Sequence, residues 1–207
     1  MQIHVGRPKD LEKRQRILMS AKHLFLKLGF HGSSMNQIAR EAGVTKLTVY
    51  NHFQDKATLF SCAIEETCES LLKAQPLDLT AHRNFKQALY QACELSLNLS
   101  NMPEAIKLEH LLMELASEQN PLALQFYNAS HAKLRAMWES FFRQAVELQF
   151  IQADEPKTQT ELIVSLLHGL RHHEVLLGVR AVPDAAQSQK IIEDAIGIFM
   201  LRYALKA

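Results

Sequence analysis

Apolar residues recur at intervals of three and four along nearly the whole of this 207-residue chain, which is the spacing of one face of an α-helix. In the first long segment, Ile17, Ala21, Leu24 and Leu28 follow that spacing. No stretch shows the sustained alternation of apolar and polar residues that indicates a β-strand. The pattern therefore predicts an all-α fold.

The six prolines divide this periodic sequence into segments, because proline disrupts the interior of a helix. The segments predict nine helices, at residues 9–28, 34–42, 45–52, 55–74, 81–100, 103–118, 121–149, 157–178 and 187–205. Gly29 is placed to end the first of them, since glycine readily adopts the positive φ of a helix C-terminal cap.

Charge is divided unevenly between the two ends of the chain. Residues 1–56 contain ten Lys and Arg against four Asp and Glu, a net charge of +6, whereas the remaining 151 residues contain 13 against 18, a net charge of −5. Such a division indicates a small head that binds a polyanion, joined to an acidic body. We expect the head to comprise residues 1–54 and the body residues 55–207.

Two short helices in the head carry the signals of a helix-turn-helix. Ser34 and Gln37 match a capping box at the start of the first helix, in which hydroxyl and amide satisfy backbone donors. Gly43 permits the backbone reversal that ends it, and Thr45 caps the second helix. Two short helices joined by a tight glycine-containing turn are the arrangement of that DNA-binding motif.

The second short helix has an apolar side and a polar side. If Val49 and Phe53 face the core, the outward residues are Lys46, Leu47, Thr48, Tyr50, Asn51 and His52. Most of these residue types donate to phosphates or read base edges in a major groove. Lys56 adds a charge at the start of the next helix, where backbone donors also favour a phosphate.

From about Arg14 to Phe60 the chain resembles the TetR family of bacterial transcriptional regulators. The specific parts are "LFLKLGF", "IAREAGV" and "TVYNHFQDKATLF". The resemblance implies an all-helical homodimer with a three-helix DNA-binding head, a larger body that binds a small-molecule ligand, and a palindromic operator in double-stranded DNA. It further implies that the last two helices of each chain pair into a four-helix bundle.

The same resemblance suggests roles for individual residues. Ser34 matches a phosphate-contacting cap, and Lys56 matches a phosphate-clamping lysine. The positions that match groove-facing or phosphate-contacting residues of the second short helix are Lys46, Leu47, Thr48, Tyr50, Asn51 and His52. Leu47 departs from the small residue or proline that is frequent at its position, so it either contacts a thymine methyl or limits docking. The basic "GRPK" at residues 6–9 is similar to arms that reach DNA in some members, and a disordered tail is the alternative.

The ligand site implied by the resemblance lies in the body, where bulky apolar residues follow helical spacing. Most of these must be core, because apolar spacing marks packing more often than a pocket. The candidates for ligand binding are Leu89, Cys93, Met113, Phe126, Trp138 and His168. Polar candidates to orient an apolar or amphipathic ligand are Tyr90, Glu109, His110, Glu114, Tyr127 and His131.

Metal, disulfide and membrane signals are weak. His168 and His172 have a chelating spacing, but no further ligand motif accompanies them, so we expect no metal and no cofactor. The three cysteines, Cys62, Cys68 and Cys93, lack a paired spacing and are interpreted as small buried hydrophobic residues. No signal peptide or run of about 20 apolar residues is visible, so the expected location is the cytoplasm, with no membrane partner.

The leading hypothesis is therefore a ligand-responsive transcriptional repressor rather than an enzyme. A regulator that activates transcription, or one without a small-molecule ligand, has the same head and dimer. A helical metal-dependent enzyme or hydrolase is the alternative from another class. The chain contains no nucleophile motif, duplicated Glu-x-x-His pair or glycine-rich phosphate loop to support that alternative.

Overall fold

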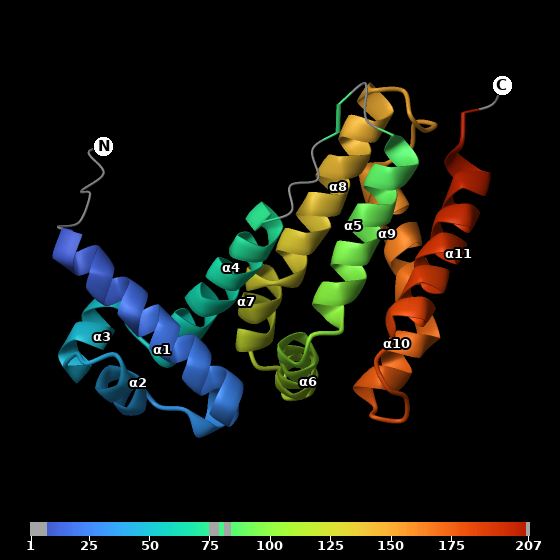
Figure 1. The fold of residues 1–207 in the computed structure, drawn as a ribbon. Coiled ribbons are helices and arrows are strands. Elements are labelled where there is room, and N and C mark those ends of the chain that lie inside the picture. The colour runs from blue at the N-terminus through green and yellow to red at the C-terminus, as the bar shows by residue number, and fades with distance from the viewer. Residues whose placement is uncertain (1–7, 75–78, 81–83, 206–207) are drawn as a thin grey trace. The chain divides into compact units, whose positions relative to one another are not determined.

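The computed structural model describes residues 8–74, 79–80 and 84–205 (Figure 1). These residues contain eleven helices and no strand, apart from one isolated bridge between Ile151 and Ala204. The helices are α1 (Pro8–Gly32), α2 (Met35–Glu41), α3 (Lys46–Phe53), α4 (Lys56–Ala74), α5 (Phe85–Ser100), α6 (Pro103–Ser117), α7 (Leu122–Ala129), α8 (His131–Glu147), α9 (Pro156–Leu167), α10 (Gly169–Leu176) and α11 (Ala185–Tyr203). The all-α prediction is confirmed. Residues 6–7 of the predicted basic arm and the predicted helix start at residue 81 lie outside the described residues.

The predicted number of about nine helices is close to the eleven in the described residues, and the difference arises because two of the predicted helices are each broken into two. The helix predicted at 121–149 breaks at Ser130 (φ −122°, ψ −82°), whose hydroxyl donates to the Phe126 carbonyl at 2.8 Å. The helix predicted at 157–178 breaks at His168, and Gly169 follows with φ +44°. Neither break contains a proline, so the positions of the prolines could not predict the two breaks. Gly29 does have a positive φ, of 74°, and kinks α1 where the first predicted helix ends.

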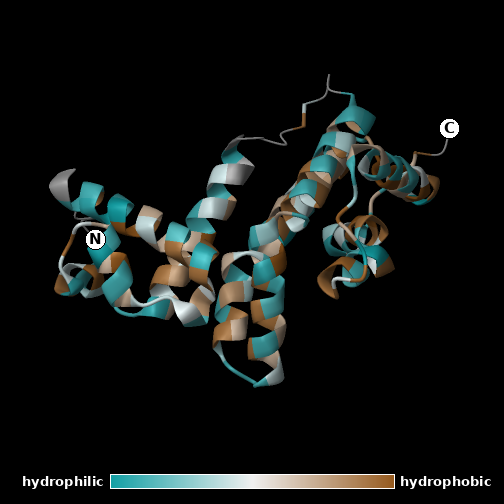
Figure 2. Ribbon diagram, turned by 60° about the horizontal axis from the view of Figure 1, so that its bottom comes forward, coloured by the Kyte–Doolittle hydropathy of each residue, from teal (hydrophilic) through white to brown (hydrophobic). Residues whose placement is uncertain are grey.

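The chain packs as two compact units. The first comprises Met1–Leu71 with Leu111–Ser130, and the second comprises Leu72–His110 with His131–Ala207. The boundary that charge predicted, after residue 54, therefore falls inside the first unit. Along each helix hydrophobic and hydrophilic residues are interspersed, as amphipathic spacing requires (Figure 2). Within the described ranges no helix is long and apolar enough to cross a membrane.

The core of the first unit joins the head helices to α4 and α7. α2 packs against both α1 and α3, and fully buried apolar side chains fill the space between the helices: Ile17, Leu18, Ile38, Val49, Phe53 and Leu59. Beside them, the Phe126 ring of α7 packs 5.2 Å from Phe30 and 4.7 Å from Phe60 between ring centroids. α7 therefore belongs to the same packed body as the two short helices.

The second unit is built from α5, α8, α9 and α11, which lie side by side in Figure 1. α8 packs against α9, and α11 packs against both α5 and α9. At its centre Phe142 stacks on Trp138 at 5.5 Å and on Phe199 at 5.0 Å. Aromatic residues thus join α8 to α11 through a single continuous core.

Replacing Phe142 with alanine is expected to lower the free energy of unfolding by about 3–5 kcal/mol, because it leaves a cavity between Trp138 and Phe199. Urea denaturation at a fixed protein concentration measures this loss. Phe142→Leu fills much of the same space and should cost clearly less. Equal costs for the two variants would contradict the packing described here.

Candidate nucleic-acid interface and ligand-binding residues

The start of α2 is capped by Ser34, as the sequence predicted. The Ser34 hydroxyl accepts from the backbone N–H of Gln37 at 3.3 Å. It also donates to Oε1 of Gln37 at 2.8 Å. The Gln37 side chain therefore accepts from the hydroxyl of Ser34 and not from the backbone N–H of Ser34. Only the first of the two hydrogen bonds of the predicted capping box is formed.

The turn between α2 and α3 depends on Gly43, whose φ of +63° lies in the left-handed region that glycine adopts at little cost. The backbone N–H groups of Gly43 and Val44 donate to the carbonyls of Arg40 and Ala39, at 3.2 and 3.0 Å, which satisfies the end of α2. Thr45 then caps α3 by accepting from the N–H of Thr48 at 3.2 Å. The local signals for the helix-turn-helix are confirmed in this geometry.

Two buried residues orient α3. Val49 and Phe53 are 0% and 1% exposed, so the opposite side of the helix faces outward. That side presents Lys46, Leu47, Tyr50 and Asn51, which are all exposed, and Thr48, which is half-buried. Leu47 is 68% exposed on this face.

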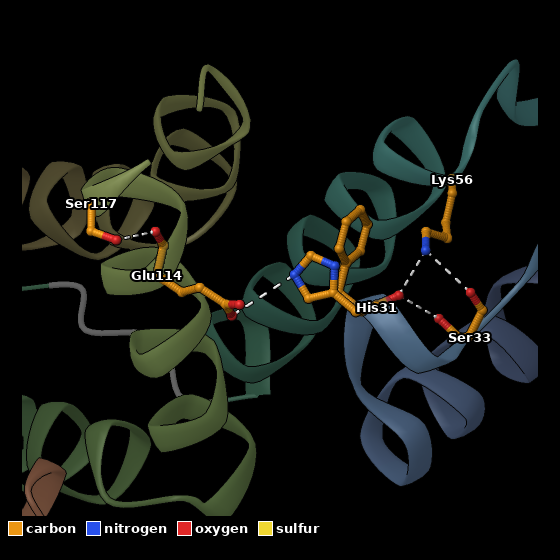
Figure 3. A network of polar contacts seen from close by, with 6 residues as sticks. His31, Ser33, Lys56, Glu114 and Ser117 are labelled. Atoms are coloured by element: carbon orange, nitrogen blue, oxygen red, sulfur yellow. Dashed lines mark hydrogen bonds and ion pairs between the residues drawn. The ribbon is translucent and has the colours of Figure 1, made fainter. Parts of the chain in front are cut away.

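Two of the residues predicted to contact DNA, His52 and Lys56, have partners within the protein. The side chain of His52 is only 14% exposed, and its Nε2 lies 3.3 Å from Oδ1 of Asp10 in α1. The Lys56 ammonium donates to the carbonyls of Phe30 and Ser33, at 2.9 and 3.2 Å (Figure 3). Burial lowers the pKa of Lys56. The structure therefore groups Lys46, Leu47, Tyr50 and Asn51 on one exposed face and places His52 and Lys56 apart from it.

The six candidate ligand-binding residues are not brought together. Leu89, Cys93 and Trp138 are fully buried within the core of the second unit. Phe126 belongs to the aromatic group of the first unit, and Met113, in the same unit, is 48% exposed. A second-unit hollow of about 10 Å³ is lined in part by His168, with Leu97, Asn101, Leu167, Arg171, His172, Val175 and Pro183. It has room for about one water molecule.

A polar cluster in the second unit surrounds His168. His131 Nε2 lies 2.5 Å from Oε1 of Glu109, so two of the predicted polar candidates meet. The rings of His168 and His172 are 5.1 Å apart, and Ser100 Oγ lies 3.5 Å from Nδ1 of His168. We call Glu109, His131, His168 and His172 the histidine cluster. Its members come from three separate segments of the chain, so periodicity could not have predicted that they meet.

Three groups of the histidine cluster have shifted pKa values. Burial, together with smaller effects of the nearby His172 and Arg171, lowers the pKa of His168 to about 4. Burial also lowers the pKa of His172. For Glu109 burial raises the pKa, but the hydrogen bond and charge of His131 outweigh it and the net shift is downward. At neutral pH the cluster therefore holds an ionised Glu109 beside a neutral His168.

Among the residues that the structure describes, no three His, Cys, Asp or Glu side chains are arranged to hold a metal ion. Of the three cysteines only Cys93 is buried, and burial raises the pKa of its thiol. Cys62 and Cys68 are half-buried, which corrects the expectation that all three are fully buried.

Two family models match the chain. The model described as "Bacterial regulatory proteins, tetR family" matches residues 17–62. The model described as "AefR-like transcriptional repressor, C-terminal domain" matches residues 87–205, which is more than half of the chain. The first match contains α2 and α3 with their caps, and the second contains the histidine cluster.

Individual proteins are similar to this chain over different lengths. The "HTH-type transcriptional activator FasR" of Mycolicibacterium smegmatis is 31% identical over 87 residues, which cover 42% of this chain and 39% of FasR. The match thus spans about two fifths of that relative. A solved structure of a TetR-family regulator from Mesorhizobium loti covers 96% of this chain and all of its own, with a TM-score of 0.83 and 23% identity, which establishes the fold. The "Flavonoid-responsive Regulator FrrA" covers 94% and 98%, with a TM-score of 0.75 and 25% identity.

The histidine cluster predicts a loss of stability in mild acid. The folded pKa of His168, about 4, lies below its ordinary value of 6.5, so between these values the unfolded chain takes up a proton that the folded chain does not. The stabilisation that depends on a neutral His168 should be fully present above about pH 6.5. The free energy of unfolding should then fall by up to about 3 kcal/mol as the pH approaches 4.

Urea denaturation of the wild type and of His168→Gln across this range tests that expectation. The variant should show a flatter pH dependence, whereas His173→Gln, at an exposed neighbour, should follow the wild type. Identical curves for wild type and His168→Gln would refute the assignment to His168.

Proposed function

The chain belongs to the TetR family of bacterial regulatory proteins, and from that premise we propose that it is a sequence-specific repressor released from a palindromic operator by a small-molecule ligand. The exposed face of α3 is the single observation that carries this proposal. It combines a lysine, a tyrosine, an asparagine and a bare leucine on one short helix, held by capped ends and a buried apolar side. The net charge of +6 on residues 1–56 supports a polyanion as partner.

In this proposal α3 enters the major groove. Asn51 and Lys46 have the chemistry to hydrogen-bond base edges, and Leu47 has the chemistry to contact a thymine methyl. Tyr50 and Ser34 contact phosphates, and Thr48, in the first turn of α3, is a further candidate contact. The ring of Tyr50 lies 5.6 Å from the Lys46 ammonium, which steadies both side chains.

We propose that two copies bind together, through the end of the chain. Large apolar side chains are exposed on α10 and α11, among them Leu170 at 73% and Leu201 at 88%. Exposed apolar residues of this size support an interface, here the homodimer through the last two helices. The α3 helices of the two copies then meet successive major grooves when their centres lie about 34 Å apart. Because the dimer is symmetric, the operator is a palindrome.

The proposed ligand is an apolar or amphipathic molecule bound by the second unit. FrrA is named as flavonoid-responsive, and a polyphenol of that class combines aromatic surface with hydroxyl groups. Leu89, Cys93 and Trp138 are the proposed apolar contacts, and His168 with its neighbour Glu109 supplies hydrogen-bonding groups. Because the three apolar residues are buried in this structure, the core has to open to admit the ligand. We leave Met113 and Phe126 out of the proposed site, because they pack in the first unit. A coupling free energy of about 1–3 kcal/mol between ligand binding and DNA binding suffices to change operator occupancy.

An activator is the second candidate, since FasR carries that name and an activator uses the same head. No observation favours the alternative of a helical metal-dependent enzyme or hydrolase, and the family is one of transcriptional regulators. A regulator of chromosomal DNA acts in the cytoplasm, which we propose as its location.

Selection of randomised duplex DNA by the purified protein tests the proposal. The selected pool should contain a palindrome with half-sites about one helical turn apart, and its binding should weaken steeply with salt. No enrichment would overturn sequence-specific binding. A transcription assay with the selected operator upstream of a promoter then separates repression from activation.

Substitutions on α3 should divide into two kinds. Asn51→Ala and Lys46→Ala should weaken operator binding and relax the preference at individual bases, by about 1–3 kcal/mol of discrimination. Tyr50→Ala should weaken binding to all sequences alike. The measurement is a repeat of the selection with each variant, and unchanged base preference in both of the first two would contradict the proposed groove contacts.

A further inference from the structure

Four buried side-chain atoms in the described part of the chain have no hydrogen-bond partner: Trp138 Nε1, Gln159 Oε1, Thr160 Oγ1 and His172 Nδ1. All four belong to the second unit. A buried polar group without a partner destabilises the fold, and native proteins satisfy nearly all such groups. Their concentration in one unit indicates groups that gain partners when another molecule binds there.

Two of these groups lie at a similar distance from the histidine cluster. α8 packs against α9, and the chain reverses direction between them, so the two helices run antiparallel (Figure 1). Trp138 follows His131 by seven residues on α8, and Thr160 precedes His168 by eight residues on α9. Both separations correspond to roughly 10–12 Å along a helix. The second unit therefore holds buried polar groups at two levels, one at the histidine cluster and one about two to three helical turns away.

The level of Trp138 requires an acceptor from the bound molecule, because an indole N–H can only donate a hydrogen bond. The surroundings of this N–H are aromatic. The Trp138 ring lies 5.9 Å from that of Phe141 and 5.5 Å from that of Phe142. An oxygen on an aromatic body therefore suits this level, since rings pack favourably on rings.

The level of the histidine cluster requires a neutral donor. The unpartnered His172 Nδ1 lies there, close enough to the Glu109 carboxylate to feel its charge. A hydroxyl can donate to a neutral imidazole nitrogen or to a carboxylate. A ligand carboxylate would be repelled by Glu109, although Arg171 nearby would attract it.

We propose that the second unit binds a neutral, elongated aromatic molecule with an acceptor oxygen for the Trp138 N–H at one end and a hydroxyl for His172 at the other. This ligand class rests on the proposed function, in which the second unit holds the ligand that controls DNA binding. Thr160 and Gln159, adjacent on α9, are further polar contacts at the level of Trp138.

The ligand binds an open form of the second unit. Trp138 is 1% exposed, and the hollow beside His172 has a volume of only about 10 Å³. The observed affinity is therefore lower than the intrinsic affinity by the fraction of the protein that is open. This factor is the same for every probe in one variant, so ratios of affinities between probes report the contacts themselves.

The test uses four probes and the purified chain without DNA. The parent probe is biphenyl with an acetyl group at one end and a hydroxyl at the other. The analogues replace acetyl with ethyl, hydroxyl with hydrogen, or hydroxyl with carboxylate. Calorimetric titration should show the parent binding roughly tenfold more tightly than each analogue, because each loses one buried hydrogen bond or gains a charge. Equal affinity for the ethyl analogue, tighter binding of the carboxylate, or no binding of the parent would overturn the proposal.

Two variants assign the two ends of the probe. Trp138→Phe should lose the preference for acetyl over ethyl and keep the preference for hydroxyl over hydrogen, and His172→Phe should do the reverse. Loss of both preferences, or of neither, would contradict the assignment. Trp138 is the single tryptophan, so its one indole N–H signal in the NMR spectrum should move with the parent probe and not with the ethyl analogue. That signal decides the acceptor end in the wild type if Trp138→Phe does not fold, and an unmoved signal counts against the proposal.

Urea denaturation followed by Trp138 fluorescence tests the premise in the protein without ligand. Thr160→Val removes an unpartnered hydroxyl and should raise the midpoint. Tyr203→Phe removes a hydroxyl that donates to Asp154 at 2.7 Å and should lower it. A lowered midpoint for Thr160→Val would refute the premise that its hydroxyl lacks a partner.

Operator selection separates this proposal from the proposed function. A chain that selects an operator and does not bind the parent probe refutes the ligand class. A chain that binds the parent probe and selects no operator refutes the proposed function and leaves the assignment of Trp138 and His172 standing.

Discussion

Burial of Val49 and Phe53 is the constraint on which the head depends. These two side chains are almost fully buried, α3 packs against α2, and Arg14 of α1 lies over the Phe53 ring. Removing either from water stabilises the fold by about 1.5–3 kcal/mol, and rotating α3 would expose both at once. The rotation of α3 about its axis is therefore determined by packing, and the outward direction of Lys46, Leu47, Tyr50 and Asn51 follows from it without any contribution from DNA.

Much of the head could be predicted from sequence because its signals are local. Ser34, Gly43 and Thr45 each act on backbone groups within four residues, so their roles can be read without knowledge of the fold. Lys56 shows the opposite case. The carbonyls that it contacts lie 23 and 26 residues away in the sequence, so local signals could not predict these contacts.

The body was less predictable for the same reason. Helical spacing identified Leu89, Cys93 and Trp138 as apolar, and it had no means to tell a core from the wall of a pocket. The break at His168 depends on Gly169, which appears in the sequence as an ordinary glycine within an apolar run. That break places two histidines beside Glu109, so the shifted pKa values of this cluster arise from a feature that periodicity hides.

The two-residue connection between α3 and α4 has an evolutionary consequence. With only Gln54 and Asp55 between the helices, and Gln54 already at a positive φ, the chain has no spare length with which to tilt α3 into a new docking angle. Descendants of this protein that recognise other operators are therefore expected to exchange side chains on α3 while its orientation stays the same. Divergence among such paralogues should concentrate at positions 46, 47, 50 and 51 and spare the residues that join the two helices.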